Sequence, residues 1–127
     1  MAAVHAGWRG VVANVVANAI AKLGEPRRLL AAIGPCIGME AFEVGPEVLA
    51  AFEKAFGPDA QLERRAGGKG RVDLRQAVRS QLIRASLSTD RIDVSDRCTH
   101  RDAGEFYSHR RDRGVTGRMA AIIAPRP

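Results

Sequence analysis

The chain has 127 residues, 46% hydrophobic and 27% charged, a composition that fits one globular domain and excludes a disordered or low-complexity chain. Its 20 basic and 14 acidic residues give a formal net charge of +6, and arginine supplies nearly all of the basic charge. Arginine suits recognition of phosphate or carboxylate, but genome base composition produces such an excess as readily as selection for a polyanionic partner.

The sequence carries no sign of membrane insertion or export. No apolar run approaches the length of a membrane-spanning helix, and the N-terminus lacks the basic and apolar regions of a signal peptide. We therefore expect a cytoplasmic protein without a membrane partner. Cys36 and Cys98 are too few and too far apart for a disulfide framework, so we expect free thiols in a reducing cytosol.

The N-terminal stretch Ala3–Gly10 predicts the end of a strand, a turn and the start of a helix. A short apolar run leads to His5, and the two glycines that follow allow the backbone to bend toward a ligand. Apolar residues then recur with helical spacing over residues 11–23, and Gly24 stands where a C-terminal cap belongs.

The position of His5 and Arg9 near this predicted helix N-terminus suggests an anion site. Unpaired N–H groups and the helix dipole favour phosphate or carboxylate there. A capped turn that buries Trp8 and leaves Arg9 in solvent explains the same residues equally well, so both interpretations stand.

The middle of the chain predicts a strand, a helix and a loop. Residues 28–33 form a short apolar run that ends at Gly34–Pro35, which is typical of a buried strand running into a turn. A proline in the first turn and an apolar stripe predict a helix over 46–56. The glycine-rich basic segment 64–71 predicts a flexible, solvated loop; a phosphate contact is the less favoured alternative, because the spacing of a P-loop is missing.

The C-terminal part predicts one further helix and two strands. Asp73 stands at an N-cap position with Gln76 three residues later, before an apolar helical stripe. Ile92 and Val94 alternate with polar neighbours as in a strand, and residues 117–123 predict a final apolar strand. Helices and strands alternate, which predicts an α/β or α+β layered domain with the sheet order left open.

Residues 98–112 concentrate polar groups between two predicted strands, where loops commonly carry sites. The groups able to ligate zinc are His5, Cys36, Cys98, His100 and His109. None of them forms a Cys-x2-Cys or His-x3-His pair, so no self-contained zinc site is evident. A Cys–His hydrolase that joins Cys36 to His5 or His109 is a second interpretation, but a small buried role for Cys36 and a structural role for His109 are simpler.

Several of these segments together match a known family. The residues are His5-Ala6-Gly7-Trp8-Arg9-Gly10, Gly34-Pro35-Cys36-Ile37-Gly38, Phe42-Glu43-Val44-Gly45, Asp73-Leu74, Cys98-Thr99, Phe106-Tyr107-Ser108-His109-Arg110-Arg111-Asp112 and Gly117-Arg118-Met119-Ala120. In this order and spacing they resemble the YfiH-type family, also called the laccase-domain or polyphenol oxidase family. The resemblance covers nearly the whole chain.

The resemblance implies a layered α-β-β-α fold with mixed sheets, of which residues 1–127 are the C-terminal part of a single domain. It also implies an enzyme, because members are regarded as zinc-dependent purine nucleoside phosphorylases. They cleave adenosine, inosine, guanosine and methylthioadenosine with phosphate, and they deaminate adenosine.

The resemblance implies that His5 is one of three zinc ligands. The other two, a histidine in a Gln-x-His-Gly motif and a cysteine in an Ala-Asp-Cys motif, lie upstream in the family and are absent from this chain. One ligand is too few for the usual four-coordinate zinc. We therefore expect activity to need a complementing N-terminal half or a homo-oligomer.

His5 and Arg9 are the expected catalytic residues, and Arg9 is also the expected contact to the anion. Arg110 and Arg111 are further candidates for substrate binding. A salt bridge with Asp112 would explain either of these two arginines without any substrate.

Two other functions stay open. The older family label, laccase or polyphenol oxidase, requires copper and electron transfer, but the sequence has no copper-type histidine-rich cluster. A non-catalytic basic module that binds nucleic acid or a partner protein would show salt-dependent binding that survives His5→Ala. Aromatic residues make up only 5% of the chain and no nucleic-acid motif is present, which disfavours a nucleic-acid partner.

Overall fold

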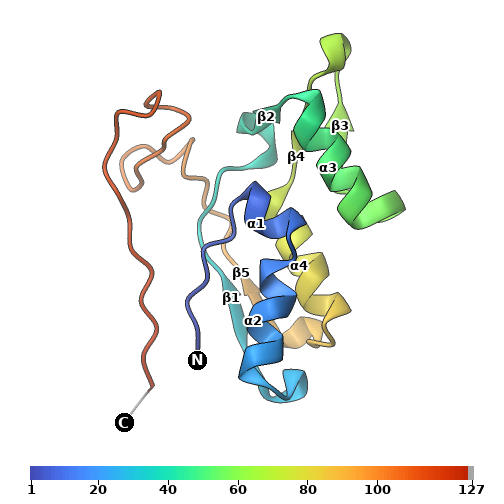
Figure 1. Cartoon of the computed structure of the whole chain (residues 1–127). Coiled ribbons are helices and arrows are strands. Elements are labelled where there is room, and N and C mark those ends of the chain that lie inside the picture. Colours follow the sequence, from blue (N-terminus) through green and yellow to red (C-terminus); the bar gives the residue numbers. More distant parts are fainter. Residues whose placement is uncertain (126–127) are drawn as a thin grey trace.

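The computed structural model describes residues 1–125 and shows four α-helices and five short strands (Figure 1). In chain order they are α1 (Trp8–Val12), α2 (Val15–Leu23), β1 (Ala31–Ile33), β2 (Glu43–Val44), α3 (Pro46–Phe56), β3 (Leu62–Arg64), β4 (Gly70–Val72), α4 (Leu74–Arg84) and β5 (Ile92–Val94). Short 3₁₀ helices lie at Pro26–Arg28, Met39–Ala41, Gly57–Asp59, Ala66–Gly68 and Thr89–Arg91. No helix in this range is long and apolar enough to cross a membrane.

The strands form two small sheets of different kinds. β1 pairs with β5 in parallel, whereas β4 lies between β2 and β3 and pairs with both of them antiparallel. The predicted α/β class with mixed sheets is therefore confirmed.

The helix predicted over residues 11–23 is in fact two helices, because the chain turns at Asn14. Asn14 has a φ of 60°, a left-handed conformation that asparagine tolerates better than most residues. Its N–H donates to the carbonyl of Val11 at 3.0 Å, which ends α1. The turn sends Val11 into one hydrophobic cluster and Val16 into another. Apolar spacing alone does not reveal it, because both helices keep a helical period.

The larger hydrophobic cluster packs α3 against α1 and β4. The apolar stripe of α3 buries Leu49 and Phe52 completely, and the Phe52 and Phe56 rings stack with centroids 5.6 Å apart. Val11 of α1 is also fully buried in this cluster. The helix predicted over 46–56 is confirmed with the same ends.

The second cluster packs α2 and α4 on one face of the β1–β5 sheet. Val16, Ile20 and Leu82 of the two helices meet Ile92 of β5 there. Both predicted strands are confirmed, although β1 begins later than the apolar run that predicts it. The result is one helical layer against one small sheet.

The α4 helix begins at the predicted cap and is tied to α1. Asp73 Oδ1 accepts a hydrogen bond from the N–H of Gln76 at 2.9 Å, an interaction that stabilises helices by about 1 kcal/mol. Further along α4, the buried Gln81 donates from Nε2 to the carbonyl of Val11 at 2.6 Å. This bond fixes the end of α1 against the middle of α4.

The loop predicted over residues 64–71 is the exposed connection of a hairpin, and only its two ends belong to strands, β3 and β4. β3 and β4 pair antiparallel, with Glu63 opposite Arg71. A Cβ on Gly70 would overlap the Glu63 carbonyl oxygen and the side chain of Leu49, so only glycine allows this close approach. Each of these two strands contains a single large apolar residue, Leu62 or Val72, so no apolar alternation marks either of them in the sequence.

Two basic residues of this hairpin are paired at the surface with acidic residues outside it. Arg64 lies 2.6 Å from Glu53 of α3, and Lys69 lies 3.1 Å from Glu43 of β2. These contacts fit the solvated alternative rather than a phosphate contact.

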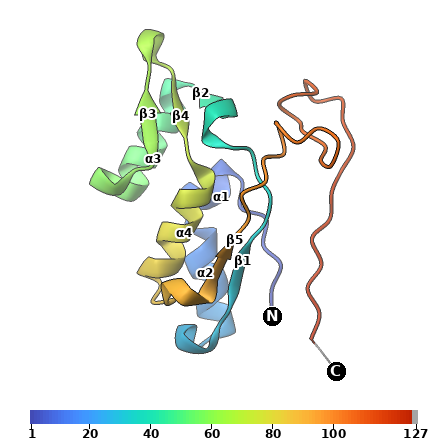
Figure 2. The ribbon, with the colours of Figure 1, turned by 180° about the vertical axis from the view of Figure 1, so that it is seen from behind.

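The strands predicted at residues 117–123 and before His5 are wrong for the described residues. Residues 117–125 and 1–7 contain no strand. A β-strand needs a neighbour that shares its backbone hydrogen bonds, and neither segment has one within residues 1–125. Both run on the side of the β1–β5 sheet that faces away from α2 and α4 (Figures 1 and 2). Ile122 is consequently 91% exposed.

Replacing Phe52 with alanine should lower the free energy of unfolding by about 3–5 kcal/mol, because the change empties a fully buried position beside Phe56. Urea unfolding followed by circular dichroism measures this loss. Lys54→Ala, at an exposed position of the same helix, is the matched control and should change stability by less than about 0.5 kcal/mol. Equal losses in both variants would contradict the packing of α3.

Candidate functional site

The N-terminal motif places His5 and Arg9 close to the start of α1. His5 is exposed in the extended segment before the helix, and Gly7 is the N-cap. A Cβ on Gly7 would lie 3.1 Å from His5 Nε2, so the glycine leaves room for the imidazole beside the turn. The turn predicted from the two glycines therefore positions an exposed imidazole.

Trp8 holds Arg9 at the surface. The indole is half-buried against the larger hydrophobic cluster, and Arg9 Cζ lies 4.6 Å from its ring centroid. A cation over an aromatic face is attracted by the ring electrons. The ion pairs within residues 1–125 do not include Arg9. This arrangement fits both the predicted anion site and the capped turn with a solvated Arg9.

The β1–β5 pairing continues past both strands as an isolated parallel bridge between Cys36 and Cys98. The N–H of Thr99 donates to the carbonyl of Cys36 at 3.0 Å. Cys36 is half-buried, Cys98 is buried, and both are free thiols. The bridge joins the turn after β1 to the start of the loop formed by residues 98–112.

The loop 98–112 contains the same five-residue turn twice. Asp102 Oδ2 accepts from the N–H of Cys98 at 2.9 Å, and Asp112 Oδ2 accepts from the N–H of Ser108 at 3.2 Å. In each turn the arginine before the aspartate donates to it from Nε at 2.8 Å. In each turn the sulfur or hydroxyl of the first residue also accepts the N–H of the fourth. These bonds shape a segment that has no helix or strand.

The contacts in the two turns lower the pKa of both aspartates. For Asp102 the largest effect is the hydrogen bond from the Arg101 side chain. For Asp112 it is the hydrogen bond from the Thr116 hydroxyl, followed by the one from Arg111. Each carboxylate is therefore harder to protonate in the folded loop than in an unfolded chain.

Arg111 uses all of its guanidinium donors inside this loop. Nε and Nη2 donate to Asp112 at 2.8 and 3.2 Å. The other N–H groups donate to the carbonyl oxygens of Thr99, His100 and Phe106. These contacts match the structural alternative. They leave no guanidinium N–H of Arg111 free to bind a substrate as predicted.

Arg110 is exposed and links the loop to the segment before α3. Its Nη1 donates to the carbonyl of Glu43 at 2.6 Å, and its Cζ lies 5.3 Å from the Phe42 ring centroid. Arg110 therefore keeps donors that a substrate could use. Its neighbour His109 is exposed, whereas His100 is half-buried.

The predicted metal-ligating groups do not come together in the described part of the chain. Within residues 1–125 no three His, Cys, Asp or Glu side chains form a group that could hold a metal ion. Zinc sites use three protein ligands or more, so the residues present do not fit a complete zinc site around His5. The neighbour of the Cys36 thiol is the guanidinium of Arg75, which is a cation and not a metal ligand.

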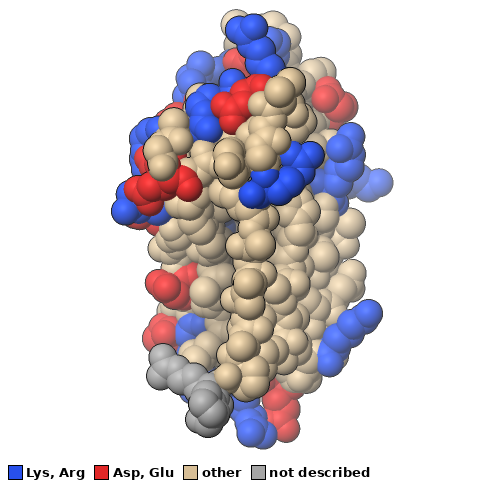
Figure 3. All heavy atoms as spheres, turned by 90° about the vertical axis from the view of Figure 1, so that its left-hand side faces the viewer, with Lys and Arg blue, Asp and Glu red and all other residues tan. Residues whose placement is uncertain are grey.

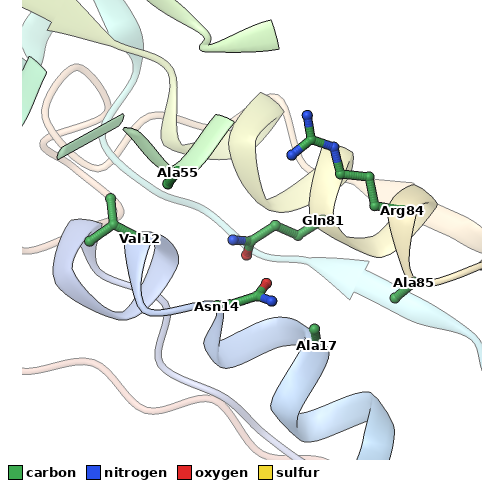
Figure 4. Close-up of a pocket in the computed structure, with 7 residues that line it drawn as sticks. All are labelled: Val12, Asn14, Ala17, Ala55, Gln81, Arg84 and Ala85. Carbon is green, nitrogen blue, oxygen red and sulfur yellow. The ribbon is translucent and has the colours of Figure 1, made fainter. Parts of the chain in front are cut away.

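A pocket of about 260 Å³ lies where the α1–α2 turn meets α3 and α4. It is lined by Val12, Asn14, Ala17, Ala55, Gln81, Arg84 and Ala85 (Figure 4). Gln81 extends into it, and its buried Oε1 has no hydrogen-bond partner among the described residues. The lining includes no imidazole, thiol or carboxylate and neither His5 nor Arg9, so this pocket is separate from the N-terminal motif.

One face of the molecule is largely uncharged. It lies on the side of the C-terminal segment, and its charged side chains gather at one end and along the margins (Figure 3). The large hydrophobic residues exposed in residues 1–7 and 115–125 are Met1, Val4, Val115, Met119, Ile122 and Ile123. Exposed apolar surface of this kind usually marks a contact with another polypeptide.

Comparison with known proteins places the chain in a family. The sequence pattern of a family described as multi-copper polyphenol oxidoreductase laccase matches residues 1–126. The chain belongs to this family. It is the YfiH-type family that the motifs indicate, so the predicted resemblance is confirmed.

Curated relatives of this YfiH-type chain are named as purine nucleoside phosphorylases. YfiH of Escherichia coli is 40% identical over 124 residues, which is 97% of this chain and 50% of that protein. YlmD of Geobacillus stearothermophilus is 36% identical over 129 residues, covering 96% of this chain and 47% of that protein. The chain thus spans about half the length of the curated relatives it matches.

Solved structures agree with this family assignment. The crystal structure of YlmD from Geobacillus stearothermophilus matches with a TM-score of 0.78 and 32% identity over 89% of this chain and 44% of that one. YfiH from Bacillus licheniformis matches with a TM-score of 0.82 and 30% identity over 89% and 45%. The YfiH-like fold is therefore shown for this chain.

Sequence patterns did not predict two features of this region. They are the paired turns of the loop 98–112 and the contact from the turn after β1, in which the N–H of Gly38 donates to Cys98 Sγ at 3.2 Å. The turns have a signal in the sequence, because an Arg-Asp dipeptide follows both Cys98 and Ser108 at the same spacing. The Gly38 contact has none, because it depends on the β1–β5 pairing.

Acid should destabilise the loop 98–112, because it protonates the two carboxylates that hold its turns. Asp102 and Asp112 have lowered pKa values when folded, so they stabilise the loop fully above the ordinary aspartate pKa of 3.8. That stability is lost as the pH falls through their lowered values. Carboxyl NMR titration measures both pKa values, and Asp112→Asn should remove one titration step. Titration of either carboxyl at or above 3.8 would contradict these contacts.

Arg111→Lys should destabilise the loop although it preserves the charge. A lysine ammonium cannot reach the carboxylate and the three carbonyls together, and lost hydrogen bonds to a charged group cost about 1.5–3 kcal/mol each. Amide hydrogen exchange over residues 98–112 should become faster. Arg110→Lys is the matched control and should change exchange there much less; the reverse order would contradict the structural role of Arg111.

Proposed function

We propose that this chain supplies part of a purine nucleoside phosphorylase. The observation that carries the proposal is the similarity to curated YfiH and YlmD phosphorylases over nearly all of this chain. The exposed His5 and the exposed Arg9 on the Trp8 face are consistent with it, because phosphorolysis needs a group that binds phosphate. In this proposal Arg9 binds the phosphate, and Arg110 contributes a weaker contact to the substrate.

The finer parts of the proposal concern zinc and substrate range. His5 would be one zinc ligand, and further ligands would come from outside residues 1–125, since the described residues offer no complete site. Cleavage of adenosine, inosine, guanosine and methylthioadenosine, and deamination of adenosine, belong to the same proposal. Copper is the metal of the older laccase label, and metal analysis of purified protein distinguishes the two.

The uncharged face is the proposed contact with the remainder of the enzyme. That remainder would be a complementing N-terminal half or a second copy of the chain, and it would cover the exposed apolar residues of both terminal segments. A cytoplasmic location is part of the proposal, because a chain with only two cysteines lacks the dense disulfide framework of small secreted domains.

Laccase activity is the second candidate, because the matching family carries that description. The two functions make opposite predictions about co-substrates. Phosphorolysis needs phosphate and no oxygen, whereas phenol oxidation needs oxygen and no phosphate. Parallel assays on one preparation therefore separate them.

His5→Ala should abolish phosphate-dependent release of hypoxanthine from inosine by a preparation that contains the rest of the domain. Arg9→Lys should instead raise KM for phosphate about 10–100-fold, since it removes a bidentate contact. Coupled spectrophotometric assays measure both effects. Arg27→Lys, an exposed arginine outside the motif, is the matched control and should leave both parameters unchanged.

Several outcomes would overturn the proposal. Full inosine turnover in His5→Ala would remove His5 from the site. Phenol oxidation without any phosphorolysis would favour the laccase candidate. Salt-dependent binding of nucleic acid that survives His5→Ala, with no turnover at all, would favour a non-catalytic basic module.

A further inference from the structure

We propose that Cys36 and Cys98 are a disulfide site, closed by exchange with a small disulfide such as oxidised glutathione. The proposal rests on the geometry between the ends of β1 and β5 and is independent of the proposed enzyme activity. It assigns a chemical role to the one pair of cysteines in the chain.

The backbone holds the two cysteines at a distance that a disulfide can span. They are partners in a parallel bridge, and neighbouring strands lie about 4.8 Å apart. Disulfides occur at Cα separations of about 4.4–6.8 Å. Because the bridge extends the β1–β5 pairing, which Figures 1 and 2 show side by side, the separation is fixed by the fold.

The two thiols face the same side of this bridge. Bridge partners on adjacent strands direct their side chains to one face of a sheet. Cys98 Sγ accepts the N–H of Gly38 at 3.2 Å, which places the sulfur over the segment that contains Cys36. A Cβ on Gly38 would lie only 3.3 Å from this sulfur, so a glycine there keeps the space open.

The turn that begins at Cys98 does not itself require a thiol. In the matching turn, Ser108 Oγ accepts the N–H of Arg111 at 3.3 Å, as Cys98 Sγ accepts the N–H of Arg101 at 3.4 Å. A serine therefore fills the same structural role four residues before an aspartate. A hydroxyl could also accept the N–H of Gly38 that Cys98 Sγ accepts, so the cysteine differs from a serine here by its thiol chemistry.

The surroundings make the two thiols unequal. Burial raises the pKa of Cys98, but the N–H groups of Arg101, Gly38 and His100 outweigh it, so its pKa is lowered overall. Burial raises the pKa of Cys36, and the Arg75 guanidinium only partly opposes this. Cys98 is thus the better thiolate but is 5% exposed, whereas the half-buried Cys36 is easier for an oxidant to reach.

The differences in pKa and exposure between the two thiols set the order of the two exchange steps. Cys36 loses its proton and attacks oxidised glutathione, which forms a mixed disulfide and releases one glutathione thiol. The Cys98 thiolate then attacks the Cys36 sulfur, forms the S–S bond and expels the second glutathione. Two protein thiols are oxidised and one small disulfide is reduced to two thiols. The first step should be slow and the second fast.

The test is incubation of the native protein with graded mixtures of reduced and oxidised glutathione, followed by alkylation and peptide mass spectrometry. In the wild type we expect a linked Cys36–Cys98 peptide, with both alkylated peptides disappearing together. Cys98→Ser, which preserves the turn, should stop at a glutathione adduct on Cys36. Cys36→Ser should leave the buried Cys98 alkylatable after unfolding.

Three results would overturn the proposal. The first is a stable glutathione adduct on Cys36 of the wild type with Cys98 still a thiol. The second is a disulfide between two chains instead of within one. The third is two unmodified thiols in mixtures that fully oxidise a reference dithiol.

Thermal unfolding is a second test. It distinguishes a disulfide that fits the folded structure from one that forms only by chance and strains it. The bond would close a long loop through α3 and α4, which should raise the melting temperature of the oxidised form. Reduction should reverse the shift, and Cys98→Ser should show none. A linked wild-type protein that melts lower than its reduced form would show that the bond is forced on the fold and would contradict a preformed site.

Discussion

The parallel pairing of β1 with β5 is the contact on which the rest of the chain depends. It joins two segments that are far apart in sequence, and α2 and α4 bury the second hydrophobic cluster against the face that it creates. It also extends to Cys36 and Cys98, from which the 34–38 turn and the loop 98–112 depart. Such a non-local contact carries a cost in chain entropy that the packing of both helices must offset. The candidate groups outside the N-terminal motif are therefore placed by one small sheet.

The loop 98–112 shows how a segment without regular structure acquires a defined shape. Its two turns each combine an aspartate that accepts a backbone N–H with an arginine that braces the same carboxylate. Arg111 extends this principle by donating to three backbone carbonyls, which would otherwise need water or a strand as partner. The arginines that give the chain its basic character are in this region mainly structural, so net charge is a poor guide to its ligands.

Sequence patterns predicted the elements whose signals are local. The stripe of α3, the Asp73 cap of α4 and the alternation in β5 each depend on neighbours within a few residues, and the structure confirms them. The turn at Asn14 escaped prediction because the apolar residues keep a helical period on both sides of it. The hairpin around Gly70 escaped prediction because it depends on the close approach of Gly70 to Glu63 and Leu49. The family motifs located His5 and the loop 98–112. They did not predict the structural role of Arg111, because three of its partners are backbone carbonyl oxygens whose positions the sequence does not show.

The two extended terminal segments have a consequence for how this polypeptide behaves in solution. Residues 117–125 and 1–7 leave N–H and C=O groups without strand partners, next to exposed side chains such as Ile122. An open backbone edge beside apolar side chains is a template for strand addition from another molecule. When it is produced alone, the chain should consequently associate with other copies as its concentration rises. A binding partner that supplies a strand should prevent this self-association.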